Sequence, residues 1–198
     1  MPAPSRLVVL AGPTAVGKGT VASYVRDHHP DVWLSVSVTT RSPRPGEIDG
    51  VHYHFVSDEV FEHMRADSQL LEWAVVHGRA KYGTPAAGVR HALHSGRPAL
   101  LEIDLQGARQ VRAAMPEALF VFLAPPSWGE LVHRLVGRGT ETAHEQDVRL
   151  RTAGTELEAV SEFDATIIND DVARAAEELV SLLQSPPSTH HNQGIPTS

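Results

Sequence analysis

The chain has 198 residues, of which 41% are hydrophobic and 21% charged, and this length is enough for one domain with a sizeable core. The absence of cysteine excludes disulfides and thiolate metal sites, and the net charge of −7 argues against the basic face that non-specific nucleic-acid binding needs. No apolar run approaches the ~20 residues of a membrane span, and residues 1–5 lack an export signal, so we expect a cytoplasmic protein without nucleic-acid or membrane partners.

The first unit along the chain is a strand followed by a glycine-rich loop. Residues 6–11 are apolar and rich in β-branched side chains, which predicts a strand buried on both faces of a parallel sheet. Residues 12–20 follow as Gly-x4-Gly-Lys-Gly-Thr, and residues 21–28 are compatible with a helix. In this context backbone N–H groups and the helix N-terminus hold phosphate oxygens, while the lysine reaches the outer phosphates. We therefore predict phosphate binding by Gly12, Pro13, Thr14, Ala15, Val16, Gly17, Lys18, Gly19 and Thr20.

The residue after the lysine departs from the usual pattern. That position normally carries a Ser or Thr as a magnesium-side ligand, but here it is Gly19, and the hydroxyl comes one place later at Thr20. The order Gly-Lys-Gly-Thr resembles the loop of adenylate kinases and is compatible with nucleotide kinase chemistry. Whether Thr20 takes the magnesium-side role is left open.

Residues 34–84 have a different texture and predict an inserted, partly β subdomain that covers one substrate. Strand-like pieces at 35–40, 53–56 and 70–77 alternate with turn signals at 43–46 and 49–50. Arg41 and Arg44 flank the first of these turns. Because guanidinium groups bind phosphate through two parallel hydrogen bonds, the pair could converge on one small dianion.

The remainder of the chain repeats the strand–helix pattern. Strands are predicted at 98–104, 118–124 and 165–169, and helices at 105–115, from an N-cap at Ser127 to 135, and at 172–184. This alternation predicts an α/β fold with a mostly parallel sheet in a three-layer core, formed by residues 6–33 and 85–184. A polar, breaker-rich segment at about 137–149 predicts a mobile lid, and residues 185–198 a disordered tail.

Two carboxylates lie at the end of the predicted strand 98–104. Glu102 and Asp104 alternate along it, so both would point to one side at the sheet edge where open α/β folds bind ligands. We predict that one or both position Mg²⁺ through water, with Thr20 as a further candidate. Which carboxylate faces a metal is left open. None of the twelve histidines shows a clear ligand spacing.

The inserted segment carries the residues of a family resemblance. Thr39-Thr40-Arg41-x2-Arg44-x2-Glu47-x2-Gly50-x2-Tyr53-x-Phe55 resembles the signature of guanylate kinases, the GMP kinases of the P-loop nucleoside monophosphate kinases, in their bacterial form. The likeness continues through 71–74, 82–84, 102–107, 122–126, 137–141 and 163–164, and so covers about residues 6–184.

The resemblance implies transfer of a phosphoryl group from ATP to GMP, with dGMP as a further acceptor and Mg²⁺ as cofactor. It implies that the GMP phosphate is held by Arg41, Arg44, Tyr53 and Tyr82. It also implies that the guanine is recognised by Ser37, Glu72, Thr84 and Asp104. In catalysis, it implies that Lys18 acts together with Arg134, Arg138 and Arg149. The chemistry of guanine agrees, because a carboxylate can accept from its N1–H and N2–H₂ groups, and hydroxyls can donate to O6. Adenine presents the opposite pattern and would leave a buried carboxylate unpaired.

Two alternatives keep the fold and change the function. A kinase that phosphorylates a sugar phosphate would have no need of a guanine-recognising carboxylate such as Glu72. An inactive interaction module, like the guanylate-kinase-like domains of scaffolding proteins, typically lacks an intact phosphate loop, whereas Gly12, Gly17 and Lys18 are all present here. The oligomeric state is not predicted.

Overall fold

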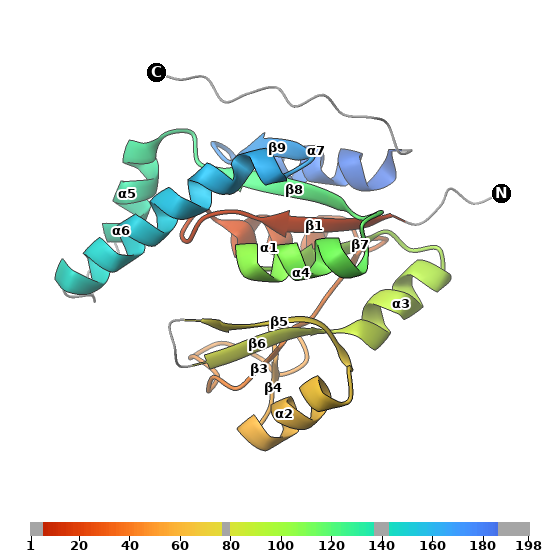
Figure 1. Ribbon diagram of the computed structural model, residues 1–198. Coiled ribbons are helices and arrows are strands. Elements are labelled where there is room, and N and C mark those ends of the chain that lie inside the picture. Colours follow the sequence, from red (N-terminus) through yellow and green to blue (C-terminus); the bar gives the residue numbers. More distant parts are fainter. Residues whose placement is uncertain (1–5, 77–79, 137–142, 186–198) are drawn as a thin grey trace.

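The structure is a computed structural model that describes residues 6–76, 80–136 and 143–185. Its larger sheet is parallel throughout and contains, in spatial order, β2 (Trp33–Leu34), β7 (Ala99–Glu102), β1 (Leu7–Ala11), β8 (Leu119–Ala124) and β9 (Ala165–Ile168). The predicted α/β class with a mostly parallel sheet is confirmed (Figure 1).

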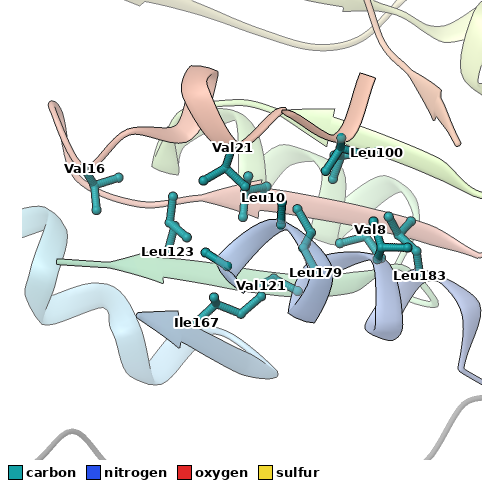
Figure 2. Packing of buried hydrophobic residues seen from close by; sticks show 14 of the residues in the cluster. Val8, Leu10, Val16, Val21, Leu100, Val121, Leu123, Ile167, Leu179 and Leu183 are labelled. Carbon is teal, nitrogen blue, oxygen red and sulfur yellow. The ribbon is translucent and has the colours of Figure 1, made fainter. Parts of the chain in front are cut away.

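Helices cover both faces of this sheet, because the side chains of its central strands alternate between the two faces. From β1, Val8 and Leu10 pack with α1 (Lys18–His28), α5 (Trp128–Val136), α6 (Ala143–Glu158) and α7 (Val172–Gln184), as Figure 2 shows for α7. Leu7 and Val9 face the other way, toward α3 (Ala86–His94) and α4 (Leu105–Ala114). All five residues of β1 are buried, as its continuous apolar run predicts.

A second sheet lies apart from the first, on the side of α4 (Figure 1). It contains, in order, β4 (His54–Phe55), β3 (Val38–Thr39), β6 (Ala80–Pro85) and β5 (Leu70–Val76), and it is accompanied by α2 (Asp58–Ala66). Edge strand β5 packs against α4 and so connects the smaller sheet to the core. A pocket between the two sheets is lined by residues of both, among them Glu72 and Tyr82 of the smaller sheet and Glu102 of the larger one.

Several elements differ from the sequence-based expectation. Helix α2 was not predicted, although Ser57 is its N-cap and accepts a hydrogen bond from Val60 N–H. Strand β7 ends at Glu102 rather than at 104, because Asp104 is the N-cap of α4. Helix α6 begins at Ala143, so the second half of the predicted lid is helical.

Parts of the other predictions fall outside the described residues. These are lid residues 137–142, which include Arg138, and tail residues 186–198. Among the helices that the structure does describe, none combines the length and apolar character needed to cross a membrane.

Candidate active site

The glycine-rich loop joins β1 to α1, and two of its glycines are required by close contacts. A Cβ at Gly12 would lie 2.3 Å from the carbonyl oxygen of Leu123 in the neighbouring strand β8. Gly17 has a φ of 98°, and a Cβ there would lie 2.6 Å from Asn169 Nδ2. Both positions therefore accept glycine alone without displacing their surroundings. Ala15 has a φ of 66°, a left-handed conformation that is uncommon for a residue with a side chain.

Lys18 folds back across this loop. Its Nζ donates to the carbonyl oxygens of Gly12 at 2.7 Å and Pro13 at 3.1 Å. Burial lowers the pKa of Lys18, while the negative charges of Glu102, Glu156 and Asp104 act in the opposite direction. The Lys18 amine of the glycine-rich loop thus interacts electrostatically with three carboxylates, which come from β7, α6 and the N-cap of α4.

Three side chains hold the loop from other elements. Asn169, just after β9, donates from Nδ2 to the carbonyl of Val16 at 2.8 Å, and Arg134 of α5 reaches the same carbonyl at 3.3 Å. Glu156 of α6 accepts from Thr14 N–H at 2.8 Å. Sequence reasoning missed Asn169 and Glu156. For Asn169 a signal existed, since a polar residue at the carboxyl end of a parallel strand lies at the ligand-binding edge.

Two pockets open on this loop. The larger, called here the loop pocket, measures about 510 Å³ and is lined by Ala15, Gly17, Thr20, His133, Arg134, Asn169, Asp170 and Val172. The second, called the cleft pocket, measures about 210 Å³ and is lined by Lys18, Ser37, Tyr53, Glu72, Ala74, Val76, Tyr82, Glu102, Ile103 and Asp104. The tertiary structure therefore brings Lys18 together with five of the eight residues predicted for GMP.

Glu72 is the buried carboxylate of the cleft pocket. It lies on β5 opposite Thr84 of β6, and Thr84 Oγ1 donates to Glu72 Oε1 at 2.7 Å. Its accessible fraction is 4%, and this burial raises the pKa of Glu72 to about 7, against the lowering effect of the Thr84 hydrogen bond. In this structure the single hydroxyl hydrogen of Thr84 is directed to Glu72. Thr84 is buried behind the carboxylate and does not line the pocket.

Glu102 and Asp104 occupy different parts of the cleft pocket. Asp104 Oδ1 accepts from Gly107 N–H at 2.7 Å, and the Asp104 charge contributes to the raised pKa of Glu72. Glu102 faces the loop instead, since a Cβ at Gly19 would lie 3.5 Å from Glu102 Oε1. Solvent reaches Glu102 through the cleft, yet surrounding protein reduces its hydration and raises its pKa, opposed by Lys18 and Arg26.

The predicted phosphate-binding arginines have different surroundings. Arg41 donates from Nη1 and Nη2 to the two oxygens of Glu47, both at 2.9 Å, and from Nε to Tyr82 Oη at 3.1 Å. This pairing lowers the pKa of Glu47 to about 2. The Arg41 guanidinium also lies 5.3 Å from the centre of the Tyr53 ring. Arg44 is exposed, and its backbone N–H donates to Glu47. Neither Arg41 nor Arg44 lines the cleft pocket.

The predicted metal and lid residues are dispersed. Thr20 lines the loop pocket, whereas Glu102 and Asp104 line the cleft pocket. Within the described residues, no group of three or more His, Cys, Asp and Glu side chains is placed to hold a metal ion. Two carboxylates beside a phosphate-binding loop do fit Mg²⁺, which commonly takes one or two carboxylates together with substrate phosphates. Arg149 lies on α6, and Arg138 lies outside the described residues.

The strand–loop–helix beginning and the parallel sheet define the class, that of P-loop nucleotide-binding proteins. The family model for guanylate kinase matches residues 4–186. A guanylate kinase of Leifsonia xyli is 62% identical over 92% of this chain and 72% of its own length, and one of Rhodococcus jostii is 57% identical over 93% and 92%. The crystal structure of guanylate kinase from Anaplasma phagocytophilum superimposes with a TM-score of 0.76 at 31% identity, covering 92% of this chain and 86% of that one.

The chain belongs to the guanylate kinase family, as its matches at this identity over most of its length show. The resemblance inferred from residues 39–55 is thereby confirmed.

Proposed function

We propose that this protein transfers the γ-phosphoryl group of ATP to GMP, and also to dGMP, yielding GDP or dGDP and ADP. The observation that carries the proposal is the cleft pocket, which places Lys18 of the phosphate loop in one cavity with the buried carboxylate of Glu72. Family membership supports a kinase that uses ATP, and the acceptor's chemistry supports GMP. The proposed site of action is the cytoplasm, where such nucleotides are recycled.

The guanine is proposed to bind at the inner end of the cleft pocket. Ionised Glu72 accepts from N1–H and N2–H₂, with Asp104 beside it, and Ser37 donates to O6. Thr84 supports this arrangement by donating to Glu72, which fixes the carboxylate's orientation. AMP is rejected because adenine would place an acceptor opposite a buried carboxylate.

The GMP phosphate is proposed to bind at the hydroxyls of Tyr53 and Tyr82, with Arg41 and Arg44. Arg41 is held by Glu47 and Tyr82, so its side chain is preorganised beside both rings. Glu47 also cancels part of its charge. The exposed Arg44 therefore supplies the less compensated positive charge for the dianion.

The donor is proposed to bind with its phosphates on residues 12–20 and the rest of ATP in the loop pocket, next to Asn169 and Arg134. Lys18 then leaves its loop carbonyls for phosphate oxygens. Transfer requires in-line placement and neutralisation of charge on the moving group, which Lys18, Arg134, Arg138 and Arg149 supply. Mg²⁺ would add positive charge at the phosphates, held by Glu102 on the loop side, with Asp104 and Thr20 as further candidates.

The test is ADP release from ATP and Mg²⁺ with GMP, dGMP, IMP, AMP and ribose 1,5-bisphosphate as acceptors. Turnover with GMP and dGMP, and near absence with AMP, is expected. Lys18→Met should abolish it, whereas Lys81→Met, which alters a lysine paired with Asp58 and Glu62, should retain it. The proposal would be contradicted if only the sugar phosphate were phosphorylated, or if none of the acceptors were.

A further inference from the structure

The outer edge of β5 is hydrogen-bonded to a side chain. Within the smaller sheet β5 is an edge strand, with β6 as its neighbour. On its other edge, Trp73 N–H donates to Gln110 Oε1 at 3.1 Å, and Gln110 Nε2 donates to the Trp73 carbonyl at 2.6 Å. The side-chain amide of Gln110 thus takes the place of a peptide group in a neighbouring strand, and it ties the smaller sheet to α4 of the core.

The same face of α4 also surrounds Glu72. Residues three apart lie on one helix face, and here they are Asp104 at the N-cap, Gly107 and Gln110. A Cβ at Gly107 would lie 2.5 Å from Glu72 Oε2, so the carboxylate lies directly against the helix backbone. Trp73, which Gln110 binds, is the residue after Glu72. One helix face therefore positions both the carboxylate and the backbone that carries it.

We propose that Gln110 is a positioning residue for guanine specificity. Its paired hydrogen bonds to Trp73 hold Glu72 at the position relative to Asp104 that recognition of the guanine N1–H and N2–H₂ groups requires. The inference rests on the proposed function and adds a residue that does not line the cleft pocket. Apolar packing alone would let β5 slide along α4. Two directed bonds to the backbone N–H and C=O of one residue permit a single register, and recognition of two adjacent donors tolerates little displacement.

The substitution that tests this is Gln110→Met, which keeps the length and removes both hydrogen bonds. Gln106→Met is the matched control, because Gln106 lies one turn earlier on α4 with an exposed side chain. For Gln110→Met we expect the KM for GMP to rise roughly tenfold, as the loss of two hydrogen bonds implies, with the KM for ATP unchanged. Gln110→Glu retains the acceptor for Trp73 N–H, so its KM for GMP should lie between those of wild type and Gln110→Met.

The decisive readout is the ratio of kcat/KM for GMP to that for IMP, which lacks the 2-amino group. This ratio should fall severalfold in Gln110→Met and stay at the wild-type value in Gln106→Met. A role confined to stability would lower the Tm and leave the ratio unchanged, and that result would overturn the inference. Absence of wild-type turnover with GMP would instead overturn the proposed function, and this inference with it.

Hydrogen exchange at the Trp73 amide checks the contact without any nucleotide. Exchange should be faster in Gln110→Met than in wild type and Gln106→Met, because the amide loses its acceptor. Equal exchange in all three proteins would show that the bond to Gln110 does not protect this amide, and would also overturn the inference. Gln110→Glu should retain the protection, which keeps the measurement interpretable if Gln110→Met folds poorly.

Discussion

Glu72 shows how one residue's environment sets its chemistry. A carboxyl on a strand between two apolar neighbours would be solvated if its face were open. Here the side chain is buried beside Asp104, and its pKa rises to about 7. A group with this pKa changes charge near neutrality, so the proposed interaction with guanine depends on pH.

We expect the affinity for GMP to fall as the pH drops below about 7. Guanine N1–H and N2–H₂ need the ionised carboxylate, and protonation replaces an acceptor by a donor. Binding should therefore release a proton near pH 6 and none well above pH 8, which calorimetry in buffers of different ionisation enthalpy measures. Glu72→Gln should bind weakly and without this pH dependence. A wild-type affinity that is flat over this range would contradict the assignment.

Gly107 yields a steric prediction at the same site. In Gly107→Ala the new Cβ would come within 2.5 Å of Glu72 Oε2, so the carboxylate must move. We expect the KM for GMP to rise by at least about tenfold, with little change for ATP. Gly154→Ala on α6 is the control, since its Cβ would meet open space and should stabilise the helix by up to ~1 kcal/mol. Unchanged kinetics in Gly107→Ala would place the acceptor elsewhere.

At the scale of elements, helix α6 is connected to the phosphate loop. Glu156 accepts from Thr14 N–H, and Arg149 lies two turns earlier on the same helix. Positions seven apart fall on nearly one face, so the bond that anchors Glu156 also orients the face bearing Arg149. The loop's shape and the proposed catalytic arginine are therefore coupled through one helix.

Removing this anchor should impair the ATP side of the reaction. For Glu156→Ala we expect the KM for ATP to rise roughly tenfold and kcat to fall. The reason is that Thr14 N–H loses the acceptor that fixes its position, and α6 loses this bond to the loop. Glu158→Ala, at the exposed end of α6, should behave as wild type. A KM for ATP that falls in Glu156→Ala would mean that the carboxylate competes with phosphate for Thr14 N–H.

At the scale of the whole molecule, the two sheets meet through the cleft and through the contact of β5 with α4. The cleft contains the carboxyl group of Glu72, and its burial favours the protonated form. Because the folded protein holds this proton more tightly than the unfolded chain, the free energy of unfolding falls as pH rises from about 4.5 through 7. The loss from Glu72 amounts to about 3 kcal/mol as an upper estimate.

Glu72→Gln should therefore stabilise the ligand-free protein above pH 7. We expect its Tm at about pH 8 to exceed that of wild type by several degrees, as removal of an ionised buried carboxylate implies. Saturating GMP should reverse the order, because binding stabilises the folded state only where affinity is retained. Thermal unfolding with and without GMP measures both. A ligand-free variant less stable than wild type would contradict the cost assigned to Glu72.

Local sequence was sufficient for the strand–loop–helix unit at residues 6–28 and for four strands of the parallel sheet, whereas the two-residue edge strand β2 was not predicted. The reason is that the phosphate loop uses consecutive residues, and buried parallel strands are continuous apolar runs. Spacing alone also placed Arg41, Arg44 and Tyr53 in one family signature. Helix α2 was missed because residues 58–66 lie between two strand-like pieces, and the whole segment was therefore interpreted as β structure.

The effects of distant residues on one another depend on the folded arrangement of the chain. Alternation along residues 70–76 does not tell which face of β5 is buried, and α4, from a later part of the chain, covers Glu72. The separate places of Glu102 and Asp104, and the contacts of Asn169, Glu156 and Gln110, likewise depend on elements far apart in sequence. The phosphate loop, the class and the family could be predicted from the chain's residues alone, because all three depend on local order. The environment of each carboxylate depends on packing, and only the fold supplies it.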